Sequence, residues 1–122
     1  MVQVKTKPYI YAVDFDGTLC ENKWPEIGAP NNGLIDFLIR QQQEGNVVIL
    51  WTMREGKSLD DALNWCKERK LIFDAVNDNI PLMKGIYGNN PRKVFANRYI
   101  DDHNFTEFEL PFHSEEYYKS VF

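Results

Sequence analysis

Residues 9–18, YIYAVDFDGT, join an apolar run to two acids and a turn, and this segment decides the fold. Its first half is rich in β-branched and aromatic residues, which predicts a buried strand. Asp16-Gly17 is a turn signal that ends the strand. Because Asp14 and Asp16 are two residues apart, both can point to the same face as the extended chain leaves the sheet. The segment therefore predicts a strand that carries two carboxylates to one edge of a sheet.

Helices and strands alternate along the rest of the chain. The run VVILW at 47–51 is nearly all apolar, as is typical of a strand covered on both faces. Ser58 has the character of a helix N-cap, with an acid three residues later. The expected elements, in chain order, are a loop over 20–33, a helix from 34 to just before Gly45, a strand over 47–51, a helix over 58–70, a strand over 72–76, an irregular stretch over 77–91, a strand over 98–101 and a short helix over 114–121.

This alternation is the pattern of an α/β fold, in which right-handed crossovers place helices on both faces of a mostly parallel sheet. The 122 residues are close to the commonest size of a domain, so we expect residues 1–122 to form one domain. Ligands of such sheets bind at the carboxyl ends of the strands. The polar residues expected at those ends are Asp14, Asp16, Thr52, Asp101 and Asp102.

Charge and hydropathy exclude several classes of protein. The chain has 14 Lys and Arg against 18 Asp and Glu, a net charge of −4, which argues against general binding to nucleic acids or anionic membranes. No apolar stretch approaches the ~20 residues that span a bilayer, and the first residues lack the apolar run of a signal peptide. We therefore expect a cytoplasmic protein with no membrane partner. Cys20 and Cys66 allow one disulfide, but free thiols are expected in that compartment.

The two acids of the first strand also predict a metal. Carboxylates as close as those of Asp14 and Asp16 repel unless a cation lies between them or one is protonated. Mg²⁺ suits such a site, because it prefers oxygen ligands and takes one or two carboxylates together with water and phosphate oxygens. A solvated acidic turn is the alternative interpretation. The apolar run before the acids and the Gly-Thr-Leu that follows them favour a site.

Four segments together resemble the haloacid dehalogenase superfamily. Its first motif, DxDx[TV] after an apolar strand, is similar to residues 14–18. The apolar strand that leads to Thr52 is similar to the second motif, and Lys93 to the third. Residues 99–102, YIDD, resemble the fourth, an apolar strand ending in paired acids. The resemblance spans residues 9–102 with the motifs in family order, and it implies a Rossmann-like (HAD-like) three-layer sandwich.

The resemblance implies a phosphohydrolase that works through a covalent intermediate. Asp14 is then the nucleophile that forms an aspartyl-phosphate. Asp16 protonates the leaving oxygen and later deprotonates the hydrolytic water. Members that cleave carbon–halogen or carbon–phosphorus bonds generally lack an acid at the position of Asp16, so its presence favours phosphate esters.

The remaining implied roles concern binding. Thr52 would donate a hydrogen bond to a phosphoryl oxygen, and Lys93 would neutralise charge on Asp14 and on the phosphoryl group. Mg²⁺ would be held by Asp14, by the backbone carbonyl of Asp16 and by the paired acids, and it stays open whether Asp101 or Asp102 is the direct ligand.

Several residues have two interpretations. Lys84 competes with Lys93 for the third motif, although Lys93 lies nearer the acid-tipped strand. Arg54 is expected either to bind a substrate anion or to form a surface ion pair. Trp24 either covers the substrate or has no part in the site. His103 and Asn104, directly after the paired acids, either line the site or belong to an ordinary loop.

The spacing of the motifs leaves no room for a separate cap domain. The 36 residues from Asp16 to Thr52 and the 41 from Thr52 to Lys93 are filled by expected elements, whereas a domain needs ~50 residues. An open site suits a large substrate or completion by a second subunit. The expected partners are a phosphorylated small molecule or macromolecular end, with a homo-oligomer as an option.

Two other functions remain open beside hydrolysis. A phosphotransferase would pass the phosphoryl group of the same intermediate to another acceptor. A catalytically silent protein would use the fold for binding alone. A signalling receiver is disfavoured, because its paired acids come first in the chain whereas here Asp101 and Asp102 come last.

Overall fold

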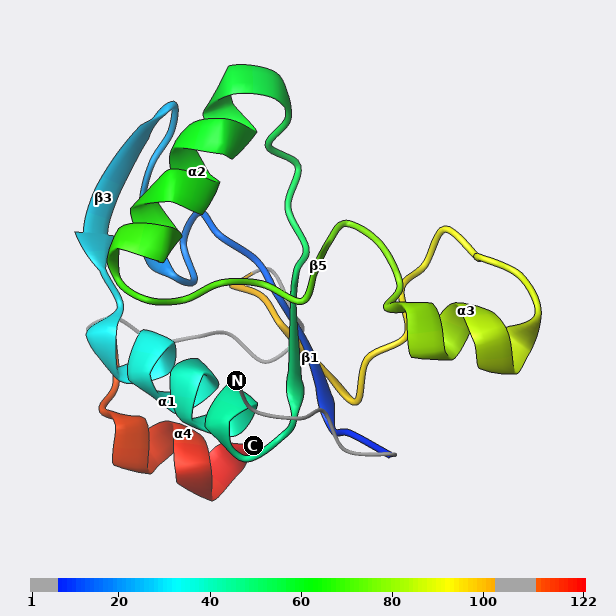
Figure 1. The fold of residues 1–122 in the computed structure, drawn as a ribbon. Helices are drawn as coiled ribbons and strands as arrows, with labels where there is room; N and C mark the ends of the chain where they lie inside the picture. Colours follow the sequence, from blue (N-terminus) through cyan, green and yellow to red (C-terminus); the bar gives the residue numbers. More distant parts are fainter. Residues whose placement is uncertain (1–6, 103–111) are drawn as a thin grey trace.

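A four-stranded sheet forms the centre of the computed structural model, which describes residues 7–102 and 112–122 (Figure 1). Its strands lie in the order β5 (Ala75–Val76), β4 (Val47–Leu50), β1 (Ile10–Val13) and β6 (Arg98–Ile100), and every neighbouring pair is parallel. β1 is central: Ala12 lies beside Ile49 on one side and Tyr99 on the other. The fold is therefore a Rossmann-like α/β fold, as the strand and helix alternation predicted.

Helices cover both faces of this sheet, which gives three layers. Figure 1 shows α1 (Asn32–Gln43), α2 (Gly56–Glu68) and α4 (Glu115–Val121) on one side and α3 (Pro81–Tyr87) on the other. Side chains of successive β1 residues point to opposite faces of the sheet and pack against both helix layers, as the two-residue period of a strand requires. Tyr11 and Val13 belong to the large core cluster with residues of α1 and α2, whereas Ile10 packs with Ile80 beside α3.

The loop expected over 20–33 is instead a β-hairpin followed by the start of α1. β2 (Cys20–Lys23) and β3 (Glu26–Pro30) pair antiparallel, with Trp24 and Pro25 between them. The prediction was wrong because it counted each Gly and Pro as a loop signal. A Cβ on Gly28 would collide with the backbone of Glu21, so this glycine permits close approach of two strands.

Other bounds differ from expectation as well, and the strand expected over 72–76 covers only Ala75–Val76. α2 begins at Gly56, and Ser58 does not cap it, because its hydroxyl donates to the carbonyl of Glu55 within the first turn. The stretch expected to be irregular contains α3, which has Pro81 in its first turn and ends at Gly88 in the left-handed conformation. These are ordinary start and stop signals of a helix.

Both cysteines are free, as expected, and both are buried. Burial raises the pKa of the Cys20 thiol to about 11 and that of Cys66 to about 12. Both side chains therefore serve as small apolar groups of the core at neutral pH. No helix within the described parts of the chain is long and apolar enough to cross a membrane.

Candidate active site

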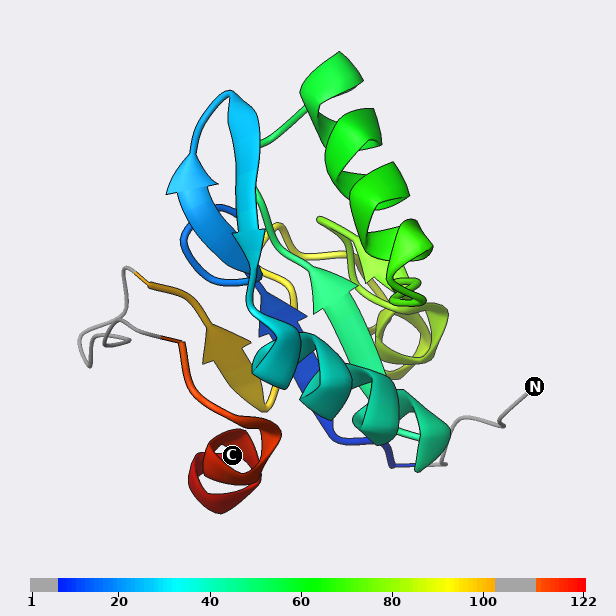
Figure 2. The same ribbon diagram turned by 90° about the vertical axis from the view of Figure 1, so that its left-hand side faces the viewer.

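The carboxyl ends of β1 and β6 bring acidic residues together. Asp14 directly follows β1, and its backbone N–H donates to the carbonyl of Ile100 on β6 at 2.9 Å. Asp101 and Asp102 follow Ile100 in the chain. Figure 2 shows the β2–β3 hairpin standing beyond these strand ends. The acids therefore lie between β1 and β6, where the order of the strands in the sheet reverses. This is the usual ligand site of the architecture.

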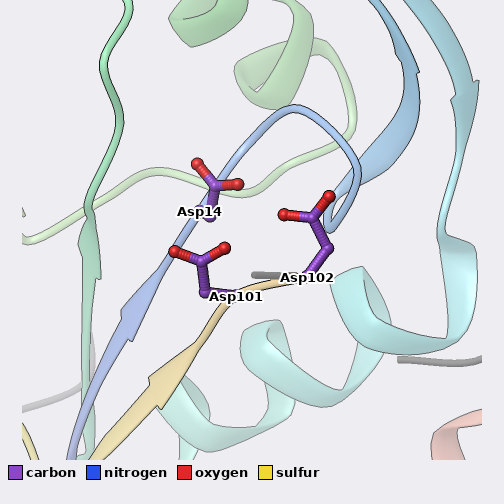
Figure 3. A group of neighbouring side chains, drawn as sticks. All are labelled: Asp14, Asp101 and Asp102. Carbon is purple, nitrogen blue, oxygen red and sulfur yellow. The ribbon is translucent and has the colours of Figure 1, made fainter. Parts of the chain in front are cut away.

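Three of these carboxylates form a cluster. Oxygen atoms of Asp14, Asp101 and Asp102 all lie within 4.8 Å of one another, and the three side chains converge in Figure 3. The backbone N–H of Asp102 donates to the hydroxyl of buried Thr18 at 3.1 Å, which ties the end of β6 to the turn after β1. The cluster is held by both strands, and it can hold a metal ion.

Gly17 makes room for this cluster. Its φ of +83° lies in the left-handed region, and a Cβ at this position would collide with the carboxylate of Asp102. Only glycine combines that backbone conformation with so close an approach. The Asp16-Gly17 turn that the sequence predicted therefore also leaves space for the carboxylate of Asp102, which follows β6.

Negative charge is concentrated in this cluster of three carboxyl groups. Burial and the neighbouring charge of Asp101 raise the pKa of Asp14 from 3.8 to about 7, and Asp102 adds to the effect. The hydrogen bond from the backbone N–H of Phe15 opposes this rise only in part. A cation placed among these oxygens would relieve the repulsion, so the donor set fits a hard metal ion.

This electrostatic strain predicts that Asp14→Asn stabilises the metal-free protein. The folded-state pKa of Asp14 lies above its usual value, so ionisation disfavours the folded state. The penalty is fully present above about pH 7 and disappears as the pH falls toward 3.8. With chelator at pH 8, the variant should gain on the order of 3 kcal/mol in its free energy of unfolding, and at pH 4 almost nothing.

Chemical denaturation at the two pH values measures this difference. Asp36→Asn is the matched control, because Asp36 is exposed on α1 and should change stability little at either pH. An Asp14 variant less stable than the wild-type protein at pH 8 would contradict the account of the cluster.

Asp16 lies outside the carboxylate cluster. Its Oδ2 accepts a hydrogen bond from Nε of Arg54 and its Oδ1 accepts one from Nη2, both at 2.8 Å. The two acids of the first motif thus have different surroundings, although the sequence allowed them one shared site. The carboxylate of Asp16 is committed to Arg54, and the metal role that the resemblance gives to its backbone carbonyl stays a prediction.

Arg54 does not form the surface ion pair that the sequence left open. The residue is only 2% exposed. Its guanidinium donates to Asp16 and to three backbone carbonyls. The hydrogen bonds and charge of Asp16 raise its pKa, while burial opposes the rise. The role of Arg54 as a ligand of the substrate stays a prediction, and the contacts in the structure are with protein groups.

Thr52 lies at the same edge of the sheet, after β4. Asn77, which the sequence did not single out, positions it. The side-chain oxygen of Asn77 accepts the backbone N–H of Thr52 at 2.8 Å. Asn77 has a φ of +51°, a conformation that asparagine tolerates better than most residues. The hydroxyl of Thr52 accepts the backbone N–H of Arg54 at 3.1 Å. Since a hydroxyl can also donate, Thr52 keeps a proton for a ligand oxygen.

Neither candidate lysine is brought to the cluster. The ammonium group of Lys93 lies 5.4 Å from the ring centroid of Tyr99, and Lys84 forms an ion pair with Asp78 at 2.8 Å. Within the described ranges, neither lysine lines the pocket above the acids. The preference for Lys93 over Lys84 therefore stays a prediction.

A pocket of about 890 Å³ opens above the strand ends. Asp14 and Asp101 line it, and so do the apolar side chains of Trp24, Trp51 and Met53. Trp24, at the tip of the hairpin, lines the pocket and is 58% exposed, and Met53 is 99% exposed. Trp24 is therefore placed where it can cover a ligand. His103 and Asn104 lie outside the described residues.

No protein-family model matches the chain, and no curated protein matches it. The solved structure of a conserved protein from Bacteroides thetaiotaomicron is similar to it, with 39% sequence identity and a TM-score of 0.73 over 84% of this chain and 83% of that one. The chain therefore belongs to the same family as that Bacteroides protein.

Proposed function

We propose that the protein is a Mg²⁺-dependent phosphohydrolase that cleaves phosphate monoesters through an aspartyl-phosphate on Asp14. One observation carries this proposal: Asp14, Asp101 and Asp102 converge at the ends of two adjacent strands, where Asp14 and Asp101 line an open pocket. The resemblance of the sequence to the haloacid dehalogenase superfamily supports it, because that resemblance implies a nucleophile at Asp14 and metal ligands at the paired acids.

The donor set favours Mg²⁺ over a softer metal. All three acidic groups of the cluster are carboxylates, and no described His or Cys joins them. Hard oxygen ligands suit Mg²⁺, whereas zinc sites usually include nitrogen or sulfur. Asp14, Asp101 and Asp102 would hold the ion. When bound, it supplies positive charge that keeps Asp14 ionised and neutralises the phosphoryl oxygens.

The first half-reaction transfers the phosphoryl group to the protein. A carboxylate oxygen of Asp14 attacks phosphorus, and the bond from phosphorus to the ester oxygen breaks. That oxygen takes the bonding electron pair and a proton from Asp16, and the alcohol leaves. Thr52 donates a hydrogen bond from its hydroxyl to a phosphoryl oxygen. The ammonium group of Lys93 lies beside Tyr99, so it would neutralise charge on the phosphoryl group only after its side chain moves toward the acids.

The second half-reaction restores the protein. The Asp16 carboxylate takes a proton from water as the water oxygen attacks phosphorus. The bond from phosphorus to the oxygen of Asp14 breaks, its electrons return to the Asp14 carboxylate, and inorganic phosphate leaves. Asp16 ends with the proton that it gave up in the first half.

The test is the metal dependence of the hydrolysis of an aryl phosphate. Activity with Mg²⁺ should fall by at least about 10²-fold in excess EDTA, because the acidic floor then repels the anionic substrate, and added Mg²⁺ should restore it. Asp102→Asn should raise the Mg²⁺ concentration needed for half-maximal activity, whereas Asp36→Asn should not. Full activity in EDTA would remove the metal from the mechanism.

A further inference from the structure

We propose that Arg54 is a positioning residue that holds the Asp16 carboxylate for hydrolysis of the phosphoenzyme and couples it to the β2–β3 hairpin. The catalytic half of this inference rests on the proposed function. The coupling to the hairpin rests on the contacts of Arg54 alone.

The contact with Arg54 fixes both the position and the orientation of the Asp16 carboxylate. Nε and Nη2 of Arg54 each donate to a different oxygen of Asp16 at 2.8 Å. Such a paired arrangement sets both the place and the plane of the carboxylate. Arg54 itself is 2% exposed, so its own position is set by packing. A base must lie within hydrogen-bond reach of the water it activates, and this contact decides where the oxygens of Asp16 are.

The same guanidinium binds the turn of the hairpin. Nη2 also donates to the carbonyls of Pro25 and Glu26, each at 3.3 Å, and Nη1 donates to the carbonyl of Ser58 on α2 at 3.1 Å. The guanidinium carbon lies 4.9 Å from the ring centroid of Trp24 at the hairpin tip. Arg54 therefore joins the acid–base residue, the hairpin and the first turn of α2 through one rigid group.

Lysine cannot reproduce this arrangement. An ammonium group donates from a single point, whereas the planar guanidinium reaches two carboxylate oxygens and carbonyls on two further elements. Arg54→Lys keeps the charge and most of the volume but loses the geometry. It therefore separates a positioning role from a simple need for positive charge.

Single-turnover kinetics with an aryl phosphate test the catalytic half. Arg54→Lys should slow hydrolysis of the phosphoenzyme by about 10-fold or more, while phosphorylation and KM change by less than about 3-fold, so that phosphoenzyme accumulates. Adding Arg54→Lys to Asp16→Asn should cost less than about 3-fold further, because residues that act as a unit are not additive. A KM raised about 10-fold with unchanged turnover, or an undiminished loss in the Asp16→Asn background, would overturn the positioning role.

Fluorine NMR of 5-fluorotryptophan-labelled protein tests the coupling without any activity. Trp24→Phe identifies the Trp24 signal. Arg54→Lys and Asp16→Asn should both shift or broaden that signal, because each breaks part of the network beneath the hairpin. Lys119→Gln is the control, since it removes ion pairs to Glu115 and Glu116 within α4. A Trp24 signal in Arg54→Lys that matches the wild-type signal would overturn the coupling.

The two experiments separate this inference from the proposed function. Wild-type protein with no phosphatase activity contradicts the proposed function and the catalytic half of the inference together. The Trp24 signal still decides whether Arg54 couples Asp16 to the hairpin in that case.

Discussion

Asp14→Asn should abolish turnover and phosphoenzyme formation together, with a loss of at least about 10⁴-fold in kcat, since a carboxamide is a poor nucleophile and losing the nucleophile of a covalent enzyme has effects of this size. The measurement combines steady-state hydrolysis of an aryl phosphate with detection of labelled phosphoprotein after acid quenching. The variant remains folded in this account, because removing the charge of Asp14 relieves repulsion in the cluster.

Asp36→Asn controls for the loss of a surface carboxyl, and it should retain wild-type kinetics. Residual phosphoenzyme in Asp14→Asn at the wild-type level would place the nucleophile on another residue. Turnover within about 10-fold of wild type would mean that no covalent step on Asp14 is needed.

Asp16→Asn should distinguish substrates by the basicity of their leaving groups. An alkyl phosphate needs its leaving oxygen protonated, so its phosphorylation step should fall by roughly 10²–10⁴-fold, the usual effect of losing a general acid. An activated aryl phosphate leaves without that proton, so its phosphorylation step should fall far less. Because Asp16 also activates the hydrolytic water, the variant should accumulate labelled aspartyl-phosphate from the aryl substrate.

Rapid-quench measurement of both steps with both substrates provides the comparison. Equal losses of the first step for alkyl and aryl substrates would show that Asp16 acts on the structure of the site and not on the leaving oxygen. Asp36→Asn is a suitable control, because Asp36 is exposed on α1.

The sequence predicted the floor of the site because that floor depends on local pattern and on a general property of parallel sheets. A buried strand followed directly by Asp14 and another followed by Asp101 place both acids at the carboxyl edge wherever the strands lie in the sheet. The pairing of β1 with β6 then brings them together. A short-range pattern and one topological rule were sufficient for this part.

The walls of the site depend on contacts that no local pattern contains. Arg54 and Asp16 are 38 residues apart, and nothing in the residues around either one indicates a bidentate pair. The hairpin was missed because Gly28 is required for close strand packing, a reason that only the paired backbone reveals. Lys93 was preferred because it lies nearer the acid-tipped strand and because Lys84 was expected in a Pro/Gly-rich loop. The structure places Lys84 in α3, and the ammonium group of Lys93 lies beside Tyr99 and not in the pocket.

The most direct test of the central claim is to locate the phosphoryl group on the protein. Asp16→Asn is incubated with an aryl phosphate and Mg²⁺, quenched in acid, and reduced with borohydride, which converts an acyl phosphate to an alcohol. Peptide mass spectrometry should then find homoserine in place of aspartate at position 14. Reduction at any other carboxylate, or no reduced residue despite turnover, would contradict Asp14 as the nucleophile.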